Sequence, residues 1–194
     1  IDQRIDAAEA HGGGGDAPPA KNPPNTSARA TVLGVTLDRP WGLAFLPDGR
    51  MLVTQRSGSL VIVRADGSGV DATVSGVPAV LFAGQGGLLD VALDPDFASG
   101  ENWVYLAYSE AGAGGSSTAL ARGRLVGNTL QDVAVIWSQS PKVAGEVHYG
   151  ARIAFRADKA LYLATGERGV ESNNGNARAD GVQNASNTIG KVMR

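Results

Sequence analysis

One unit of sequence occurs three times in this chain, and this repetition limits the folds that the chain can adopt. The copies are WGLAFLPDGRMLVTQ (41–55), LLDVALDPDFASGENWVYLAY (88–108) and YGARIAFRADKALYLATGE (149–167). Each copy has an apolar run, a turn with Pro-Asp or Ala-Asp, and a second apolar run, which is the pattern of two strands joined by a turn. Repeats of roughly 40–50 residues made of short strands are typical of β-propeller blades. We therefore predict an all-β propeller.

The number of blades follows from the length of the repetitive region. Residues 29–194 are enough for about three to four blades at the usual repeat length. Propellers usually close with about four to eight blades, so we predict a partial propeller of about three blades, the N-terminal half of a ring. The last residues, TIGKVMR (188–194), resemble one more strand. The Gly-rich EAGAGGSS (110–117) and the segment before His148 are predicted to be an inserted loop.

No long helical periodicity interrupts this region, and short apolar runs separated by turn signals predict strands throughout it. Some runs are apolar at successive positions, as expected for strands covered on both faces, and others alternate. The predicted strands are GLAFL (42–46), MLVTQ (51–55), SLVIVR (59–64), VYLAY (104–108), ALARGRLV (119–126), VAVIWSQ (133–139), RIAF (152–155) and LYLAT (161–165).

Residues 1–28 have a different composition and are predicted to be a flexible linker. The stretch DQRIDAAEA (2–10) resembles a short helix, but isolated helices under about 12 residues are marginal in water. It is followed by HGGGGDAPPAKNPPNTS (11–27), which is rich in Gly and Pro and nearly without apolar anchors. We interpret His11 as a solvated linker residue, because no second type of metal ligand clusters near it.

Composition excludes several classes of function. The 194 residues carry a formal net charge of −2 with both signs interspersed, so no basic surface for nucleic acid is expected. The absence of cysteine excludes thiol catalysis, Cys-ligated zinc, iron–sulfur clusters and c-type haem. No apolar run approaches the roughly 18 residues that would span a bilayer. The first residue is Ile1 rather than Met, so we expect that any signal peptide has been removed.

Familiar catalytic and nucleotide-binding motifs are missing. GQGGLL (84–89) lacks the third glycine of a dinucleotide fingerprint, and IGKV (189–192) lacks the other residues of a phosphate-binding loop. No G-x-S-x-G nucleophile elbow occurs. Four aspartates fall in the repeated turns, and we interpret them as turn formers that bond their own backbone: Asp48, Asp94, Asp96 and Asp158.

A small group of polar residues remains as a candidate site. Gln85 precedes an inner strand, His148 holds the equivalent place in the next repeat, and Glu167 and Arg168 follow that repeat's second strand. Loops of this kind gather at one end of a propeller, and a histidine there can accept a proton at neutral pH. The spacing leaves alternatives open: a loop histidine bonded to backbone, a turn-capping Gln85 and a surface salt-bridge partner at Arg168.

Several of these stretches together resemble the glucose/sorbosone dehydrogenase family, the soluble aldose sugar dehydrogenases. The resemblance rests on RPWGLAFLPDGRMLVTQRSGSL (39–60), GQGGLLDVALDPDF (84–97), HYGARIAF (148–155), LYLATGERG (161–169) and QNASNTIGKVMR (183–194). It extends over about residues 29–194, with the motifs in the same order and spacing. It implies a six-bladed propeller that carries pyrroloquinoline quinone (PQQ) and oxidises aldose sugars to lactones.

The resemblance also implies roles for individual residues. His148 matches the general base that takes the proton of the anomeric hydroxyl while hydride passes from C1 to the quinone. Gln85 matches a residue that lines the substrate and cofactor pocket. Arg168 stands where a relative has a pocket glutamine, and Val147 stands where some relatives have Asp. We therefore expect cofactor or substrate binding by Gln85 and Arg168, and we assign no metal ligand within this chain.

Other implications of the resemblance concern the rest of such a protein. Most residues that hold the quinone, and the ligands of its Ca²⁺ ion, are expected in later blades, so we expect this chain alone to bind the cofactor weakly and to be inactive. We expect a periplasmic or secreted location and an external electron acceptor. Two alternatives are a non-catalytic propeller that binds sugar or another protein, and a homodimer in which two copies pair into one ring because their sheet edges are exposed.

Overall fold

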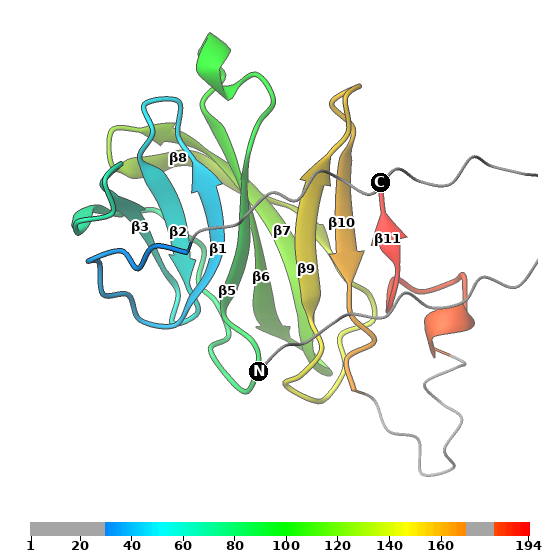
Figure 1. Cartoon of the computed structure of the whole chain (residues 1–194). Coiled ribbons are helices and arrows are strands. Elements are labelled where there is room, and N and C mark those ends of the chain that lie inside the picture. The colour runs from blue at the N-terminus through cyan, green and yellow to red at the C-terminus, as the bar shows by residue number, and fades with distance from the viewer. Residues whose placement is uncertain (1–29, 170–180) are drawn as a thin grey trace, which may run out of the picture. The chain divides into compact units, whose positions relative to one another are not determined.

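The computed structural model describes residues 30–169 and 181–194, so the predicted linker over 1–28 lies outside the described residues. The chain divides into two units, Ile1–Val32 and Leu33–Arg194, and the second contains all the strands discussed below. In the described part of this unit, the strands form three antiparallel sheets (Figure 1).

Each sheet is an antiparallel meander in which consecutive strands are neighbours. The first sheet contains β1 (Pro40–Phe45), β2 (Met51–Gln55), β3 (Ser59–Val63) and β4 (Val70–Val74). The second contains β5 (Leu88–Leu93), β6 (Trp103–Gly112), β7 (Gly115–Val126) and β8 (Thr129–Ser138), with the 3-10 turn η1 (Phe97–Ser99) after β5. The third contains β9 (Gly150–Phe155), β10 (Leu161–Thr165) and β11 (Val192–Met193).

The first strands of the three sheets form the inside of the arrangement. β1 contacts β5, and β5 contacts β9, so the sheets follow one another as blades around a common side. The prediction of an all-β propeller segment with about three blades is therefore confirmed. The repeated unit corresponds to the first two strands of each blade, since Phe45↔Met51, Leu93↔Val104 and Phe155↔Leu161 are all closing pairs of the inner hairpins.

Apolar side chains fill the spaces between adjacent blades. Between the first and second blades, Leu52 and Ile62 pack with Leu88 and Leu106. On the other face of β5, Leu89 packs with residues of the third blade, including Ile153 and Leu163 of β9 and β10. The second blade is thus covered on both faces, which explains why LLDVAL has apolar residues at successive positions.

Two buried polar side chains connect the blades. The Thr54 hydroxyl donates to the Leu89 carbonyl at 2.5 Å and accepts from the Gly42 N–H at 2.7 Å, joining the first blade to the second. In the second blade, Asp90 Oδ2 accepts the Ile153 N–H of β9 at 2.7 Å. These contacts fix the relative position of β1, β5 and β9, the strands from which the candidate site extends.

Three of the four aspartates predicted to form turns do so, one in each blade. The carboxylates of Asp48, Asp94 and Asp158 each accept the backbone N–H two residues later, at 3.1, 2.9 and 3.1 Å. Asp96 differs from the prediction, because its carboxylate binds Lys159 Nζ of the next blade at 2.6 Å instead of its own turn. Asp48, Asp94 and Asp158 are therefore local turn formers, whereas Asp96, the second Asp of Asp-Pro-Asp in the middle copy, connects two blades.

The prediction of an inserted loop over 110–117 is wrong. β6 continues to Gly112 and β7 begins at Gly115, so these residues form the tip of a long hairpin with a two-residue turn. Glycine permits this tip, because a Cβ on Gly115 would lie 2.2 Å from the Val143 carbonyl oxygen. β4 was not among the predicted strands, and its exposed face explains the weak apolar signal of VDATV.

One face of β1 is exposed: Trp41, Leu43 and Phe45 alternate along this strand and are all solvent-accessible. In the described ranges 30–169 and 181–194, no helix has the length and apolar character needed to cross a membrane.

Candidate functional site

The predicted site residues lie at one end of the blades. In an antiparallel hairpin the start of the first strand and the end of the second strand are adjacent. His148 precedes β9, Glu167 and Arg168 follow β10, and Gln85 precedes β5. The structure therefore brings the loops of the second and third blades together at the end opposite the aspartate turns.

Gln85 is in direct contact with the backbone of His148. Its side-chain oxygen Oε1 accepts the His148 N–H at 2.9 Å, and its own N–H donates to the Glu146 carbonyl at 2.7 Å. Gln85 therefore connects the glycine-rich loop of the second blade to the histidine loop of the third. The Gln85 side chain thus bonds to the next blade, in contrast to the alternative in which it caps its own turn.

His148 adopts an unusual backbone conformation. Its φ is +50°, in the left-handed region that is uncommon for residues other than glycine. Such conformations persist where surrounding contacts hold them, and they cluster at functional sites. The Gln85 amide and the Arg168 N–H, which donates to the His148 carbonyl at 3.2 Å, hold both peptide groups of the residue.

The imidazole of His148 pairs with the carboxylate of Glu167. Nδ1 contacts Glu167 Oε1, with 43% of the His148 side chain and 32% of the Glu167 side chain exposed. Burial raises the pKa of Glu167, but hydrogen bonds from His148 and from backbone N–H groups outweigh it and hold the pKa below its ordinary value. The ionised carboxylate accepts a hydrogen bond from Nδ1–H, which leaves Nε2 as the basic nitrogen.

The segment TGERG after β10 packs directly against the histidine loop. A Cβ on Gly166 would lie 1.8 Å from the His148 carbonyl oxygen, so only glycine permits this approach. A Cβ on Gly169 would lie 2.4 Å from Val147 and 3.5 Å from the imidazole Nδ1. The sequence placed Glu167 in the candidate group but gave it no role. The structure shows that its carboxylate contacts the His148 imidazole.

Arg168 is completely buried, with 0% of its surface exposed. Its guanidinium donates to the carbonyls of Val147 and Gly145 at 2.8 and 2.9 Å and to Ser116 Oγ at 2.7 Å. The alternative of a surface salt-bridge partner is therefore wrong. The prediction that Arg168 binds substrate or cofactor stays a prediction, since its two terminal nitrogens are occupied by these protein acceptors.

Arg56 supports the loop that carries Gln85. Its guanidinium contacts the Gly84 carbonyl and donates to the Gly86 carbonyl at 3.1 Å, while its own carbonyl accepts the Leu88 N–H at 3.1 Å. A Cβ on Gly87 would lie 2.0 Å from the Arg56 carbonyl oxygen. A continuous set of contacts thus runs from the first blade through Gln85 to His148, and the sequence motifs gave no sign of Arg56.

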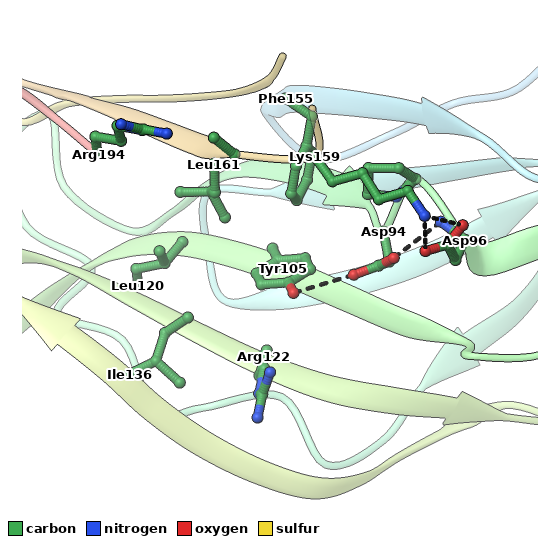
Figure 2. Close-up of a pocket in the computed structure, with 12 residues that line it drawn as sticks. Asp94, Asp96, Tyr105, Leu120, Arg122, Ile136, Phe155, Lys159, Leu161 and Arg194 are labelled. Atoms are coloured by element: carbon green, nitrogen blue, oxygen red, sulfur yellow. Dashed lines mark hydrogen bonds and ion pairs between the residues drawn. The ribbon is translucent and has the colours of Figure 1, made fainter. Parts of the chain in front are cut away.

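The pocket in Figure 2 lies at the other end of these blades and contains none of the predicted site residues. It has a volume of about 520 Å³ and lies between the second and third blades. In it Tyr105 O–H donates to Asp94 at 3.1 Å, and Lys159 contacts Asp96 (Figure 2). Lys159 and Asp96 pair across the two blades, so we interpret this pair as structural.

Comparison with known proteins agrees with the fold. The family model described as glucose/sorbosone dehydrogenase matches residues 37–194. The chain belongs to this family. Within the glucose/sorbosone dehydrogenases, the chain is 45% identical over 140 residues to the aldose sugar dehydrogenase YliI of Escherichia coli strain K12. That match covers 70% of this chain and 37% of the relative.

Solved structures from the family superpose on the same region. The apo form of the soluble aldose sugar dehydrogenase of Escherichia coli has a TM-score of 0.71 and 40% identity, covering 81% of this chain and 44% of that one. The PQQ-bound aldose sugar dehydrogenase of Streptomyces coelicolor has a TM-score of 0.69 and 32% identity, covering 84% of this chain and 46% of that one. The chain thus spans less than half the length of these relatives.

The donors at the His148 end fit part of a quinone site. They offer one exposed imidazole, whose Nδ1 contacts the Glu167 side chain, while the Gln85 side chain accepts the backbone N–H of the same histidine. In the described part of the chain, no three His, Cys, Asp or Glu side chains group in a way that would hold a metal ion. These residues can therefore supply a base beside a bound cofactor, while a set of acidic metal ligands is not found among them.

Proposed function

We propose that this chain forms part of a PQQ-dependent aldose dehydrogenase in which His148 is the general base. The observation that supports this most is the pairing of His148 Nδ1 with Glu167, which leaves Nε2 as the proton acceptor at an exposed position. A family relative of known structure binds PQQ. The reaction would oxidise an aldose to its lactone.

The proposed role of His148 is to accept the proton of the anomeric hydroxyl through Nε2. When bound, PQQ supplies the two-electron acceptor for the hydride that leaves C1 of the sugar. Loss of the O–H proton and the C1 hydride leaves the C1=O bond of the lactone. As the imidazole becomes positively charged, the Glu167 carboxylate stabilises it and keeps the ring orientation fixed.

Gln85 has a proposed role in substrate or cofactor binding, which rests on its position beside the base. Its Oε1 is used by the His148 N–H, so the side-chain NH₂ group is the part that can donate to a ligand. Arg168 has the same proposed role from the family resemblance, but its buried guanidinium can act on a ligand only through the loop that it holds.

Several further parts of the proposal rest on the resemblance alone. They are the Ca²⁺ ion that accompanies PQQ, the external electron acceptor and the periplasmic or secreted location. The homodimer also stays a prediction. Although Trp41, Leu43 and Phe45 expose an apolar face, nothing in the described part of the chain identifies what covers it.

Reconstitution tests the proposal. The chain, and any longer natural protein that contains it, would be incubated with PQQ and Ca²⁺, and aldose-dependent reduction of a dye would be followed. Binding of PQQ would be measured separately from its absorbance, so that failure to bind and failure to react can be distinguished. We expect sugar-dependent dye reduction that requires PQQ.

Two controls make the result specific. Omission of the sugar or of PQQ should abolish dye reduction, and a sugar alcohol, which has no anomeric hydroxyl, should not replace the aldose. Tight PQQ binding without any aldose-dependent turnover in the longer protein would contradict the proposed reaction and favour a non-catalytic binding module.

A further inference from the structure

The surroundings of Arg168 are unusual for a buried charge. A buried cation is costly unless it is paired or fully hydrogen-bonded. In the part of the chain that the structure describes, no carboxylate lies within ion-pair distance of Arg168. Its guanidinium lies over the ring of Tyr149, 3.4 Å from the ring centre, and among the described residues its Nε has no hydrogen-bond partner. The burial of this charge without a carboxylate partner therefore indicates that Arg168 has a specific role in the structure.

The side chain of Arg168 donates to two carbonyls in the loop before His148 and to the Ser116 hydroxyl, which itself contacts that loop. Nη1 donates to the Val147 carbonyl and Nη2 to the Gly145 carbonyl, so the two arms of the guanidinium span the three residues that precede His148. The backbone N–H of Arg168 donates to the His148 carbonyl at 3.2 Å. Arg168 therefore binds the backbone of the histidine loop both before His148 and at the carbonyl of His148 itself.

Ser116 and Tyr149 complete this cluster. Ser116 Oγ accepts from Arg168 Nη2 at 2.7 Å, lies 3.0 Å from the Gly145 carbonyl, and shares a hydrogen bond of 2.9 Å with the Tyr149 hydroxyl. Tyr149, the residue after His148, is buried beneath the guanidinium. The cluster thus connects the long hairpin of the second blade to both neighbours of the histidine.

A guanidinium suits this position better than an ammonium group. Its planar fork donates in two fixed directions, and its flat face stacks on an aromatic ring. Lysine carries the same charge, but a single ammonium nitrogen cannot donate along both arms of this fork and lie flat on Tyr149. Replacing Arg168 by lysine therefore distinguishes the role of the two-armed guanidinium from the role of the positive charge alone.

We propose that Arg168 is a positioning residue for His148. By holding the carbonyls of Gly145 and Val147, it keeps the histidine loop in the conformation in which Nδ1 meets Glu167 and Nε2 is free. This inference rests on the proposed function for its catalytic consequence. Arg168 would thus affect the reaction by holding the histidine loop, without contacting the ligand directly.

The test reads the imidazole directly, without a cofactor. The chain has two histidines, so a His11→Gln background leaves His148 as the one imidazole in a ¹⁵N-histidine NMR spectrum. In this background we expect one tautomer, with the proton on Nδ1. Arg168→Met should give a mixture of the two tautomers, and Arg168→Lys should give an intermediate result, because it retains a donor but not the fork.

A matched control separates this effect from the general loss of an arginine. Arg156 lies at the other end of β9 with 63% of its side chain exposed. Arg156→Met should leave the His148 spectrum unchanged. Thermal unfolding followed by circular dichroism would show whether each variant is folded. Where Arg168→Met does not fold, Ser116→Ala, which removes one acceptor of the fork, should shift the tautomers in the same direction by less.

The kinetic expectation follows from the geometry. In the sugar-oxidising protein, Arg168→Met should lower kcat about 100-fold with a smaller change in KM, since misplacing a catalytic group by about 1 Å can cost this much. Folded Arg168→Met or Ser116→Ala with an unchanged His148 tautomer would overturn the inference. Absence of sugar oxidation by the unaltered protein would contradict the proposed function instead, and the NMR comparison would still decide the role of Arg168.

Discussion

Gln85 and His148 belong to different blades, and the side-chain oxygen of the first accepts the backbone N–H of the second at 2.9 Å. The two residues are 63 positions apart in the sequence. This contact fixes the base through its backbone and leaves its imidazole to pair with Glu167. The position of the base therefore depends on how the second and third blades pack, and each of the following predictions tests one part of that arrangement.

Removal of the Gln85 acceptor should loosen the histidine loop. In Gln85→Ala the His148 N–H loses its partner, and a single net hydrogen bond contributes about 1 kcal/mol. Gln85→Glu keeps an oxygen acceptor at this place. We expect kcat to fall about fivefold in Gln85→Ala and to recover in part in Gln85→Glu, measured as PQQ-dependent sugar oxidation. Equal loss in both variants would show that the amide NH₂ group, and not the acceptor, is what matters.

Removal of the imidazole should abolish turnover. His148→Ala eliminates the proton acceptor, and general base catalysis contributes about 100-fold to 10,000-fold. Binding of PQQ, measured from its absorbance, should remain close to that of the unaltered protein. His11→Ala serves as the control and should retain full turnover. Near-normal sugar oxidation by His148→Ala would exclude this residue as the base.

The Glu167 carboxylate should contribute to stability in a pH-dependent way. Its pKa in the folded chain lies below the ordinary value of 4.5, so between these two values the folded chain binds fewer protons than the unfolded chain. The contribution is complete above about pH 4.5 and is lost as the pH falls through the folded pKa.

Urea unfolding of the unaltered chain and of Glu167→Gln would measure this contribution. The difference in unfolding free energy should be below about 1 kcal/mol, as for partly exposed pairs, and should shrink as the pH falls below about 4.5. A difference that grows on acidification would contradict the assignment of Glu167 as an ionised partner of His148.

The Thr54 hydroxyl should stabilise the contact between the first two blades. Thr54 is 0% exposed and joins Gly42 to Leu89. Thr54→Val keeps the shape of the side chain but leaves the Gly42 N–H without its acceptor, at a cost of about 1–3 kcal/mol. Thr73→Val, on the exposed face of β4, is the matched control and should change stability little. Urea unfolding would measure both, and equal stability of the two variants would contradict the role of Thr54.

Tyr108 should stay protonated to high pH. Burial, together with the nearby Glu110 carboxylate, raises its pKa to about 12. Because the folded pKa exceeds the ordinary value of 10.0, the stabilisation is complete below about pH 10 and is lost as the pH rises through about 12. The ultraviolet absorbance of tyrosinate would show a titration step near pH 12, and Tyr108→Phe should remove that step. Complete ionisation near pH 10 would contradict the burial of Tyr108.

The sequence by itself determined the blade as the repeating unit. Apolar runs on both sides of an Asp-containing turn specify a hairpin wherever they occur, because strand alternation and turn chemistry are local. That is why the inner hairpins and the turns at Asp48, Asp94 and Asp158 were predicted correctly. It also placed His148 at the start of an inner strand, which is a statement about order along the chain.

Only the tertiary structure decided what these residues touch. The partner of His148 Nδ1 lies 19 residues away, and the Ser116 hydroxyl that receives Arg168 lies 52 residues away. Contacts at such separations depend on the packing of one blade against the next, which no local pattern encodes. For the same reason the sequence left Arg168 as a surface or ligand-binding residue, whereas packing buries its charge beneath the loop of the base.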